Sequence, residues 1–140
     1  MSPRIAVFTK NRTNPAYEAA RFGADRVAAH LSAQTTHYVP ERPDNVIEQI
    51  ALIERAIATR PDAVVFTPVH ETAVNDAILG FDAARIPMFN FVTRATAGHC
   101  ICFVGSDDRS LATDIARYLF SKLGGRGEIV ILEGTPASAT

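Results

Sequence analysis

The stretch VIEQIALIERAIATRPDAVVFT, residues 46–67, decides the fold class of this chain. Its first part carries an apolar stripe at helical spacing, which is formed by Val46, Ile50, Ile53 and Ile57. The stripe predicts an amphipathic helix within residues 44–60, and Pro61 ends that helix. The run 63–67 is then apolar nearly throughout, which is typical of a strand in a parallel sheet covered on both faces. A helix that leads directly into such a strand predicts an α/β fold.

The same alternation extends in both directions along the chain. Apolar runs predict further strands at residues 4–9, 36–39, 88–92, 100–105 and 128–133. Helical periodicity predicts further helices over residues 15–31 and 74–84, and a last helix that begins after Ser106 or Asp107 and carries an apolar stripe from Leu111 to Leu123. The apolar side of the first of these helices is expected to consist of Ala20, Ala24, Val27 and Leu31. Right-handed crossovers between such strands favour a doubly wound parallel sheet, whose ligands bind at the carboxyl ends of the strands.

The composition is that of one globular domain and excludes several classes of partner. The chain has 140 residues, a formal net charge of -1 and basic residues that are scattered rather than clustered. We therefore expect no nucleic-acid partner and no attraction to an anionic membrane surface. No apolar stretch approaches the roughly 20 residues that span a bilayer. No signal peptide precedes the first strand, so the protein is either cytoplasmic or its export signal is absent from this sequence.

Two cysteines, Cys100 and Cys102, lie in the predicted strand 100–105. Residues two apart on a strand point to the same face, so we interpret both as small buried apolar side chains. A metal site that used His99 would need further ligands at suitable spacing, and the sequence offers none. We expect no metal.

The loops after the strands lack the common signatures of catalysis. The sequence contains no glycine-rich dinucleotide loop, no phosphate-binding loop and no nucleophile elbow. A phospho-acceptor of the flavodoxin-like type would need acidic residues after the first strand, where this chain has Thr9 and Lys10. We therefore expect a protein that is not an enzyme and has no cofactor.

The same loops hold amide, aromatic, guanidinium and carboxylate groups that suit a neutral polyhydroxylated ligand. The candidate ligand-binding residues are Asn14, Tyr17, Asn90, Arg94, Asp107 and Asp108. Carboxylates and amides accept hydrogen bonds from hydroxyl groups, the rigid fork of an arginine donates to hydroxyl oxygens, and an aromatic ring covers the C–H face of a sugar.

Each candidate also has a purely structural interpretation. Asn14 precedes Pro15 and is a typical helix N-cap, and Tyr17 could belong to the core or to the surface. Asn90 could satisfy backbone groups within its strand, and Arg94 could be a solvated loop charge. Ser106 or Asp107 is expected to cap the last helix, where acidic residues such as Asp107 and Asp108 favour the helix dipole.

Four segments resemble, in order and spacing, the periplasmic sugar-binding proteins of the ribose-binding type. They are IAVFTKNRTNPAYEAARFGADRVAAHL (5–31), VIEQIALIERAIATRPDAVVFTPVHETAVNDAI (46–78), ARIPMFNFVTRA (84–95) and FVGSDDRSLATDIARYLFSKLGGRGEIVILEGTPASAT (103–140). The resemblance covers nearly the whole chain. It implies a two-lobed protein of the type I periplasmic binding fold that closes on its ligand about a hinge.

The resemblance also implies a division of the chain and a set of partners. Residues 1–105 would form a Rossmann-like N-terminal ligand-binding lobe, and residues 106–140 would begin a C-terminal lobe that is incomplete here. The protein would be the periplasmic solute receptor of a sugar ABC transporter, with a sugar or polyol as ligand and a membrane permease as partner. The incomplete second lobe is expected from a truncated or partial sequence, or from a naturally short protein that self-associates to bury it.

The resemblance assigns ligand contacts to Asn14, Tyr17 and Arg94, and it matches Asp107 and Asp108 to the hinge-side pair after the fifth strand. This chain departs from the family pattern at Ala16, where an aromatic residue is common, and at Thr93, where an aspartate usually precedes the arginine.

Two other classes of protein stay open on the sequence alone. One is the effector-binding domain of a lactose-repressor-type regulator, which shares this fold behind a DNA-binding segment. The other is a flavodoxin-like enzyme.

Overall fold

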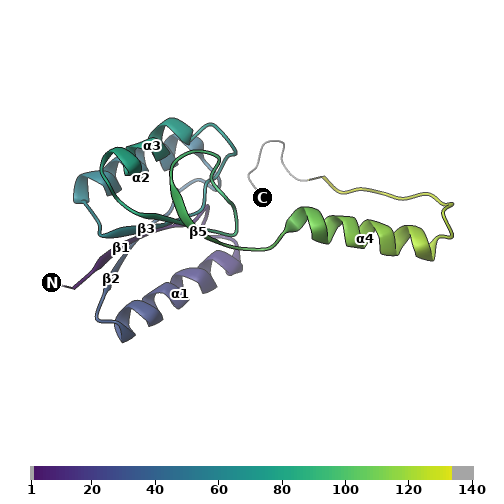
Figure 1. Ribbon diagram of the computed structural model, residues 1–140, viewed down its shortest axis with the longest axis horizontal. Coiled ribbons are helices and arrows are strands. Elements are labelled where there is room, and N and C mark those ends of the chain that lie inside the picture. Colours follow the sequence, from purple (N-terminus) through teal and green to yellow (C-terminus); the bar gives the residue numbers. More distant parts are fainter. Residues whose placement is uncertain (1, 134–140) are drawn as a thin grey trace.

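The computed structural model of the protein describes residues 2–133, and these form an α/β fold built on one five-stranded sheet (Figure 1). In chain order its elements are β1 (Arg4–Phe8), α1 (Pro15–His30), β2 (Gln34–Tyr38), α2 (Val46–Thr59), β3 (Ala63–Phe66), α3 (Asn75–Ala83), β4 (Met88–Phe91), β5 (Cys100–Val104) and α4 (Asp108–Lys122). No helix among the described residues has the length and apolar character needed to cross a membrane.

The sheet has the strand order β2-β1-β3-β4-β5, and neighbouring strands are parallel. Helix α1 lies on one face of the sheet, and α2 and α3 lie on the other (Figure 1). This arrangement confirms the predicted doubly wound parallel sheet. Because the strands are parallel, the loops that follow β1, β3, β4 and β5 lie along one edge of the sheet.

The main core lies between the sheet and the pair α2 and α3. The ring centroids of Phe8 and Phe66 are 5.1 Å apart, and that of Phe81 from α3 is 5.9 Å from Phe66. Tyr38 stacks on Phe8 at 4.8 Å, and Ile53 from α2 is fully buried beside them. Each buried side chain of this size stabilises the fold by roughly 1.5–3 kcal/mol, so this face of the sheet supplies most of the apolar stabilisation.

The apolar side predicted for α1 is wrong in part. Val27 is 59% exposed and Leu31 is 68% exposed, whereas the buried residues of this helix are Tyr17 and Ala28. Helix α1 packs mainly beside the edge strand β2, so the side of the helix that carries Val27 is uncovered. Helical spacing identified the helix but not the part of it that meets the sheet.

The interpretation of the two cysteines is also corrected. Cys100 is opposite Met88 and Cys102 is opposite Phe89, because Ile101 is an extra residue that bulges out of the ladder. The bulge places the two cysteines on opposite faces of the sheet, and Cys102 is exposed. Both are free thiols.

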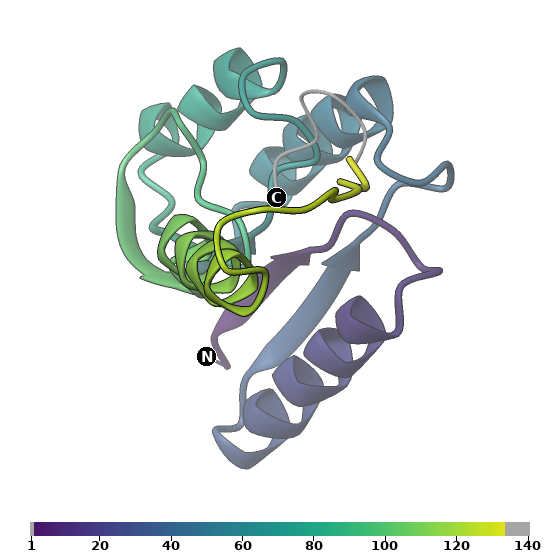
Figure 2. The same ribbon diagram turned by 90° about the vertical axis from the view of Figure 1, so that its right-hand side faces the viewer.

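The last part of the described chain extends away from the sheet. Helix α4 projects beyond the rest of the molecule (Figure 1) and points toward the viewer in Figure 2. None of its residues is buried. Exposed apolar side chains on it include Leu111, Ile115, Tyr118, Leu119 and Phe120.

The strand predicted at residues 128–133 does not form. These residues are exposed and have no regular secondary structure. A strand needs a neighbour that completes its hydrogen bonds, and no described strand pairs with this segment. The loop that was expected after this strand, residues 134–140, lies outside the residues that the structure describes.

Candidate functional site

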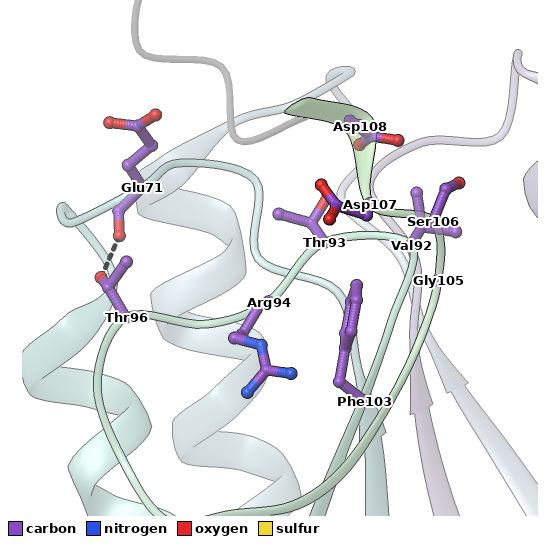
Figure 3. A pocket seen from close by; sticks show the side chains of 10 residues that line it. All are labelled: Glu71, Val92, Thr93, Arg94, Thr96, Phe103, Gly105, Ser106, Asp107 and Asp108. Carbon is purple, nitrogen blue, oxygen red and sulfur yellow. Dashed lines mark hydrogen bonds between the residues drawn. The ribbon is translucent and has the colours of Figure 1, made fainter. Parts of the chain in front are cut away.

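A cavity of about 590 Å³ opens at the carboxyl edge of the sheet, between the loop after β4 and the loop after β5 (Figure 3). It is lined by Glu71, Val92, Thr93, Arg94, Thr96, Phe103, Gly105, Ser106, Asp107 and Asp108. The lining is mostly polar, with hydroxyl, carboxylate and guanidinium groups around one aromatic ring. Its position is the one where parallel sheets of this kind bind ligands.

The loop after β4 turns sharply as it enters the cavity. The backbone N of Val92 donates to the carbonyl oxygen of Val104 at 2.9 Å, and the backbone N of Thr93 donates to the carbonyl of Phe91 at 2.7 Å. Val92 has a φ of 62°, which is unusual for a β-branched residue. The Thr67 hydroxyl donates to the same carbonyl of Phe91 at 2.8 Å, and so ties the turn to the end of β3.

Thr96 fastens the far end of this loop to the loop after β3. Its hydroxyl donates to the carbonyl oxygen of Glu71 at 2.5 Å (dashed in Figure 3) and lies 3.2 Å from Oδ1 of Asn75 at the start of α3. Segments that follow two different strands are therefore joined at the cavity.

Arg94 lies beside the aromatic ring of the cavity. Its guanidinium carbon is 4.8 Å from the centroid of the Phe103 ring, and Figure 3 shows the two side chains next to each other. A guanidinium over an aromatic face is attracted by the negative charge of the ring π-system. A guanidinium carries five N–H donors in a rigid fork, and such donors suit a ligand oxygen.

Asp107 and Asp108 bring carboxylates to the cavity at the start of α4. Asp107 is the N-cap of this helix, and its Oδ1 accepts a hydrogen bond from the backbone N of Ser110 at 3.0 Å. This confirms a cap at Ser106 or Asp107 and identifies Asp107 as the capping residue. One oxygen of Asp107 is thus used by the helix, while both side chains still line the cavity.

Asn90 lies beneath the cavity, within β4. It is 1% exposed, and its Nδ2 donates to the carbonyl oxygen of Phe66 at 3.2 Å. Its Oδ1 accepts from the backbone N of Ala95 at 3.0 Å. The amide therefore joins the end of β3 to the loop that carries Arg94.

Asn14 and Tyr17 lie at the end of β1, and neither is among the residues that line this cavity. The Oδ1 of Asn14 accepts a hydrogen bond from the backbone N of Ala16 at 2.9 Å. Asn14 is therefore the N-cap of α1, and Pro15 is the first residue of the helix. Tyr17 is 6% exposed. Burial, and secondly the charge of Asp44, raise the pKa of its hydroxyl above the ordinary value of 10.0.

A buried polar cluster accompanies them. Arg21 donates from Nη1 to the Thr9 hydroxyl at 2.8 Å and to the carbonyl of Asn11 at 3.1 Å. Lys10 in the same cluster is 2% exposed, and its burial lowers the pKa of its ammonium below 10.5. The polar chemistry at the end of β1 is therefore largely internal to the fold.

The structure brings Arg94, Asp107 and Asp108 together and keeps Asn14, Tyr17 and Asn90 outside the cavity wall. Sequence reasoning missed Phe103, Thr96 and the loop carbonyl of Glu71 as parts of the site. Phe103 was interpreted as one member of a buried apolar run. The only signal for it was its place two residues before Gly105, where the strand ends.

Comparison with solved structures gives the same fold. A glucose-galactose binding protein from Geobacillus stearothermophilus, GanP, matches with a TM-score of 0.88 and 19% identity over 99% of this chain and 49% of that chain. An ABC transporter solute binding protein from Agrobacterium vitis, bound with alpha-D-tagatopyranose, matches with a TM-score of 0.84 and 23% identity over 99% and 50%. An ABC transporter periplasmic solute binding protein from Actinobacillus succinogenes, with bound D-allose, matches with a TM-score of 0.83 and 28% identity over 98% and 50%.

A family model described as a periplasmic binding protein domain matches residues 5–140. The chain therefore belongs to the periplasmic binding protein family, and the predicted resemblance to the family's sugar-binding members is confirmed. It spans about half the length of the solved relatives that it matches. A search of curated proteins found no significant match.

Proposed function

We propose that this chain binds a monosaccharide or another small neutral polyol at the cavity after β4 and β5, as part of the solute receptor of a sugar ABC transporter. The observation that carries the proposal is the placement of the Arg94 guanidinium and the carboxylates of Asp107 and Asp108 around one cavity. Donors and acceptors that line one cavity complement the hydroxyl groups of a sugar, each of which both donates and accepts. The sugars bound by the solved relatives have this chemistry.

The proposal includes the setting in which the receptor works. Residues 1–105 would form the N-terminal lobe, and residues 106–140 would begin the second lobe, which closes over the ligand. The receptor would act in the periplasm without catalysing a reaction, and would deliver its sugar to a membrane permease. The exposed apolar side chains of α4, such as Ile115 and Leu119, support burial against further protein, either the rest of a second lobe or a second copy of the chain.

We propose only peripheral roles for Asn14 and Tyr17, which do not line the cavity. Asn14 is exposed at the carboxyl edge, where its cap bond leaves its Nδ2 donor for other partners. Tyr17 is more deeply buried, so we propose that it supports the loop that presents Asn14.

Saturation-transfer NMR with the 140-residue chain tests the proposal. D-galactose, D-allose, D-tagatose and L-rhamnose are titrated separately. Because the wall of the site supplied by a second lobe is incomplete, we expect a dissociation constant of about 1 mM rather than tight binding. Arg94→Ala should weaken binding roughly tenfold or more, as expected for lost hydrogen bonds from a charged donor. Arg26→Ala, at an exposed arginine of α1, is the matched control and should leave the affinity unchanged.

The absence of saturation transfer from all four sugars would overturn the proposal for this chain. An equal effect of Arg94→Ala and Arg26→Ala would move the site away from this cavity. Conversion of a sugar to a new product during the titration would instead indicate an enzyme.

A further inference from the structure

The Arg94 side chain is exposed and has a long flexible stem, so it can adopt many rotamers by itself. A fixed position of its guanidinium therefore depends on a contact with its surroundings. Its guanidinium contacts the Phe103 ring, with 4.8 Å between the guanidinium carbon and the ring centroid. Figure 3 shows this ring rising from β5 beside Arg94 at the wall of the cavity. The ring is therefore the surface against which the guanidinium is held.

The position of the ring depends in turn on Gly105. Phe103 is half-buried and pairs with Asn90 in the sheet, and the tip of its ring reaches the backbone two residues later. A Cβ atom built on Gly105 would overlap Cζ of Phe103 and would lie 3.0 and 3.1 Å from Cε1 and Cε2. These distances are shorter than van der Waals contact, so any side chain at residue 105 would displace the ring.

We infer that Phe103 is a positioning residue for Arg94, and that Gly105 provides the space for its ring. The three residues form a stack in which the backbone of Gly105 sets the ring and the ring sets the guanidinium. This inference rests on the proposed function, in which Arg94 donates to the ligand.

The stack assigns the aromatic ring a role different from the one usually expected in a sugar site. The face of Phe103 that Arg94 covers is not available for stacking against the C–H face of a sugar. Phe103 therefore acts on the ligand through Arg94, by fixing the direction of the N–H donors before the ligand arrives. Preorganised donors bind more tightly than mobile ones because less side-chain freedom is lost on binding.

A ligand-free NMR measurement on the 140-residue chain tests the stack directly. Ring currents of Phe103 should shift the δ-methylene protons of Arg94 upfield, with resonances assigned by comparison with Arg94→Lys. Phe103→Leu should abolish the shift, and Phe103→Tyr, which keeps the ring, should preserve it. Gly105→Ala should reduce it, whereas Gly23→Ala, at a glycine with no neighbouring atom within 4 Å of a built Cβ, should not. The stack of Arg55 on Tyr38, at 5.4 Å, provides an internal reference that should not change in any of these variants.

A double-variant cycle with the sugar panel separates positioning from direct contact. If Phe103 acts through Arg94, Phe103→Leu weakens binding roughly tenfold in the wild-type background but has no further effect in the Arg94→Ala background. A further loss in that second background would show that the ring touches the sugar, and would overturn the inference.

The two proposals fail in different ways. The positioning inference is overturned, even if sugars bind, when the δ-methylene protons of Arg94 show no upfield shift in the wild-type chain. It is also overturned when that shift survives Phe103→Leu. A shift that behaves as expected, in a chain that binds no sugar, retains the stack and removes the proposed ligand.

Discussion

The Oδ1 atom of Asn90 accepts a hydrogen bond from the backbone N of Ala95 at 3.0 Å, across the turn that opens the cavity. The same amide donates to the carbonyl of Phe66. A single buried side chain thus satisfies backbone groups from two segments whose own ladders have ended. Asn90 was expected to touch ligand, and its geometry favours a role one layer below, as a support for the Arg94 loop.

Asn90→Ala should lower the free energy of unfolding by roughly 1–3 kcal/mol, because it leaves a buried carbonyl and a partly buried N–H without this partner. Urea denaturation followed by circular dichroism measures the loss. The ring-current shift of Arg94 should decrease in the same variant, since the loop loses its anchor. Unchanged stability and an unchanged shift together would show that the loop is held without Asn90.

Val92 holds a left-handed backbone conformation, with φ at 62°, and its side chain is 46% exposed. This conformation destabilises the folded chain by roughly 1–2 kcal/mol for an L-residue with a Cβ atom. Because the exposed side chain contributes little packing, Val92→Gly should increase the free energy of unfolding relative to Val92→Ala by about 1 kcal/mol. The alanine variant is the matched control, since it removes the branched side chain but keeps Cβ. A glycine variant less stable than the alanine variant would contradict this account of the turn.

Lys10 makes stability depend on pH in the alkaline range. Burial lowers the pKa of Lys10 below 10.5, so between its folded pKa and 10.5 the unfolded chain binds more protons than the folded chain. The contribution of Lys10 to the free energy of unfolding therefore increases as pH rises through this window. Lys10→Met should flatten this rise when urea unfolding is measured from neutral pH to about pH 10.

Tyr17 acts with the opposite sign at higher pH. Its raised pKa means that the folded chain keeps the phenolic proton above pH 10.0 while the unfolded chain loses it, so its contribution falls there. Tyr17→Phe should remove that fall without changing the rise below it. For the Lys10 prediction, the contrary outcome is a free energy of unfolding that still rises toward pH 10 in Lys10→Met, which would assign the rise to another group.

Asp25 joins α1 to the edge strand β2. Its Oδ1 accepts from the Thr35 hydroxyl at 2.5 Å and lies 2.7 Å from Nε2 of His37. The Thr35 hydrogen bond, followed by the His37 contact, lowers the pKa of Asp25 below 3.8. The stability this gives is present above the unfolded pKa and is lost as pH falls through the folded pKa.

Asp25→Asn should therefore destabilise the chain at neutral pH by less than about 1 kcal/mol, since the Asp25 side chain is half-exposed and water screens its interactions. The difference from the wild type should disappear at strongly acidic pH. Asp114→Asn, which removes an exposed carboxylate 3.5 Å from Arg117 on α4, is the control and should have no effect at either pH. A difference that is constant with pH would mean that charge is not its cause.

The fold could be predicted from the sequence because its main signals are local. Runs such as 63–67 and the stripe of α2 each reflect the surface that the element buries. Two features of the fold could not be predicted from such local signals. The bulge at Ile101 depends on pairing with β4, and the burial of the polar Gln49 depends on its bonds to Thr67 and Val69 across the core.

The site could be predicted in part, for a similar reason. Arg94, Asp107 and Asp108 follow strands, so the parallel topology alone brings them to one edge. The role of Phe103 depends on where one ring points, and that of Asn90 depends on backbone groups left open by the turn. Neither depends on residue type or spacing alone.

The position of β1 between β2 and β3 has a consequence for the synthesis of the chain. Its two partners in the sheet, β2 and β3, both come later in the sequence, so β1 leaves the ribosome with two open edges. At roughly 5–20 residues per second, about 3–12 seconds pass before Phe66 is synthesised and the second edge can be covered. During that interval the segment is open to chaperones and to strands of neighbouring nascent chains. The rate of translation over residues 8–66 should therefore influence the yield of soluble protein before any cavity residue has been added.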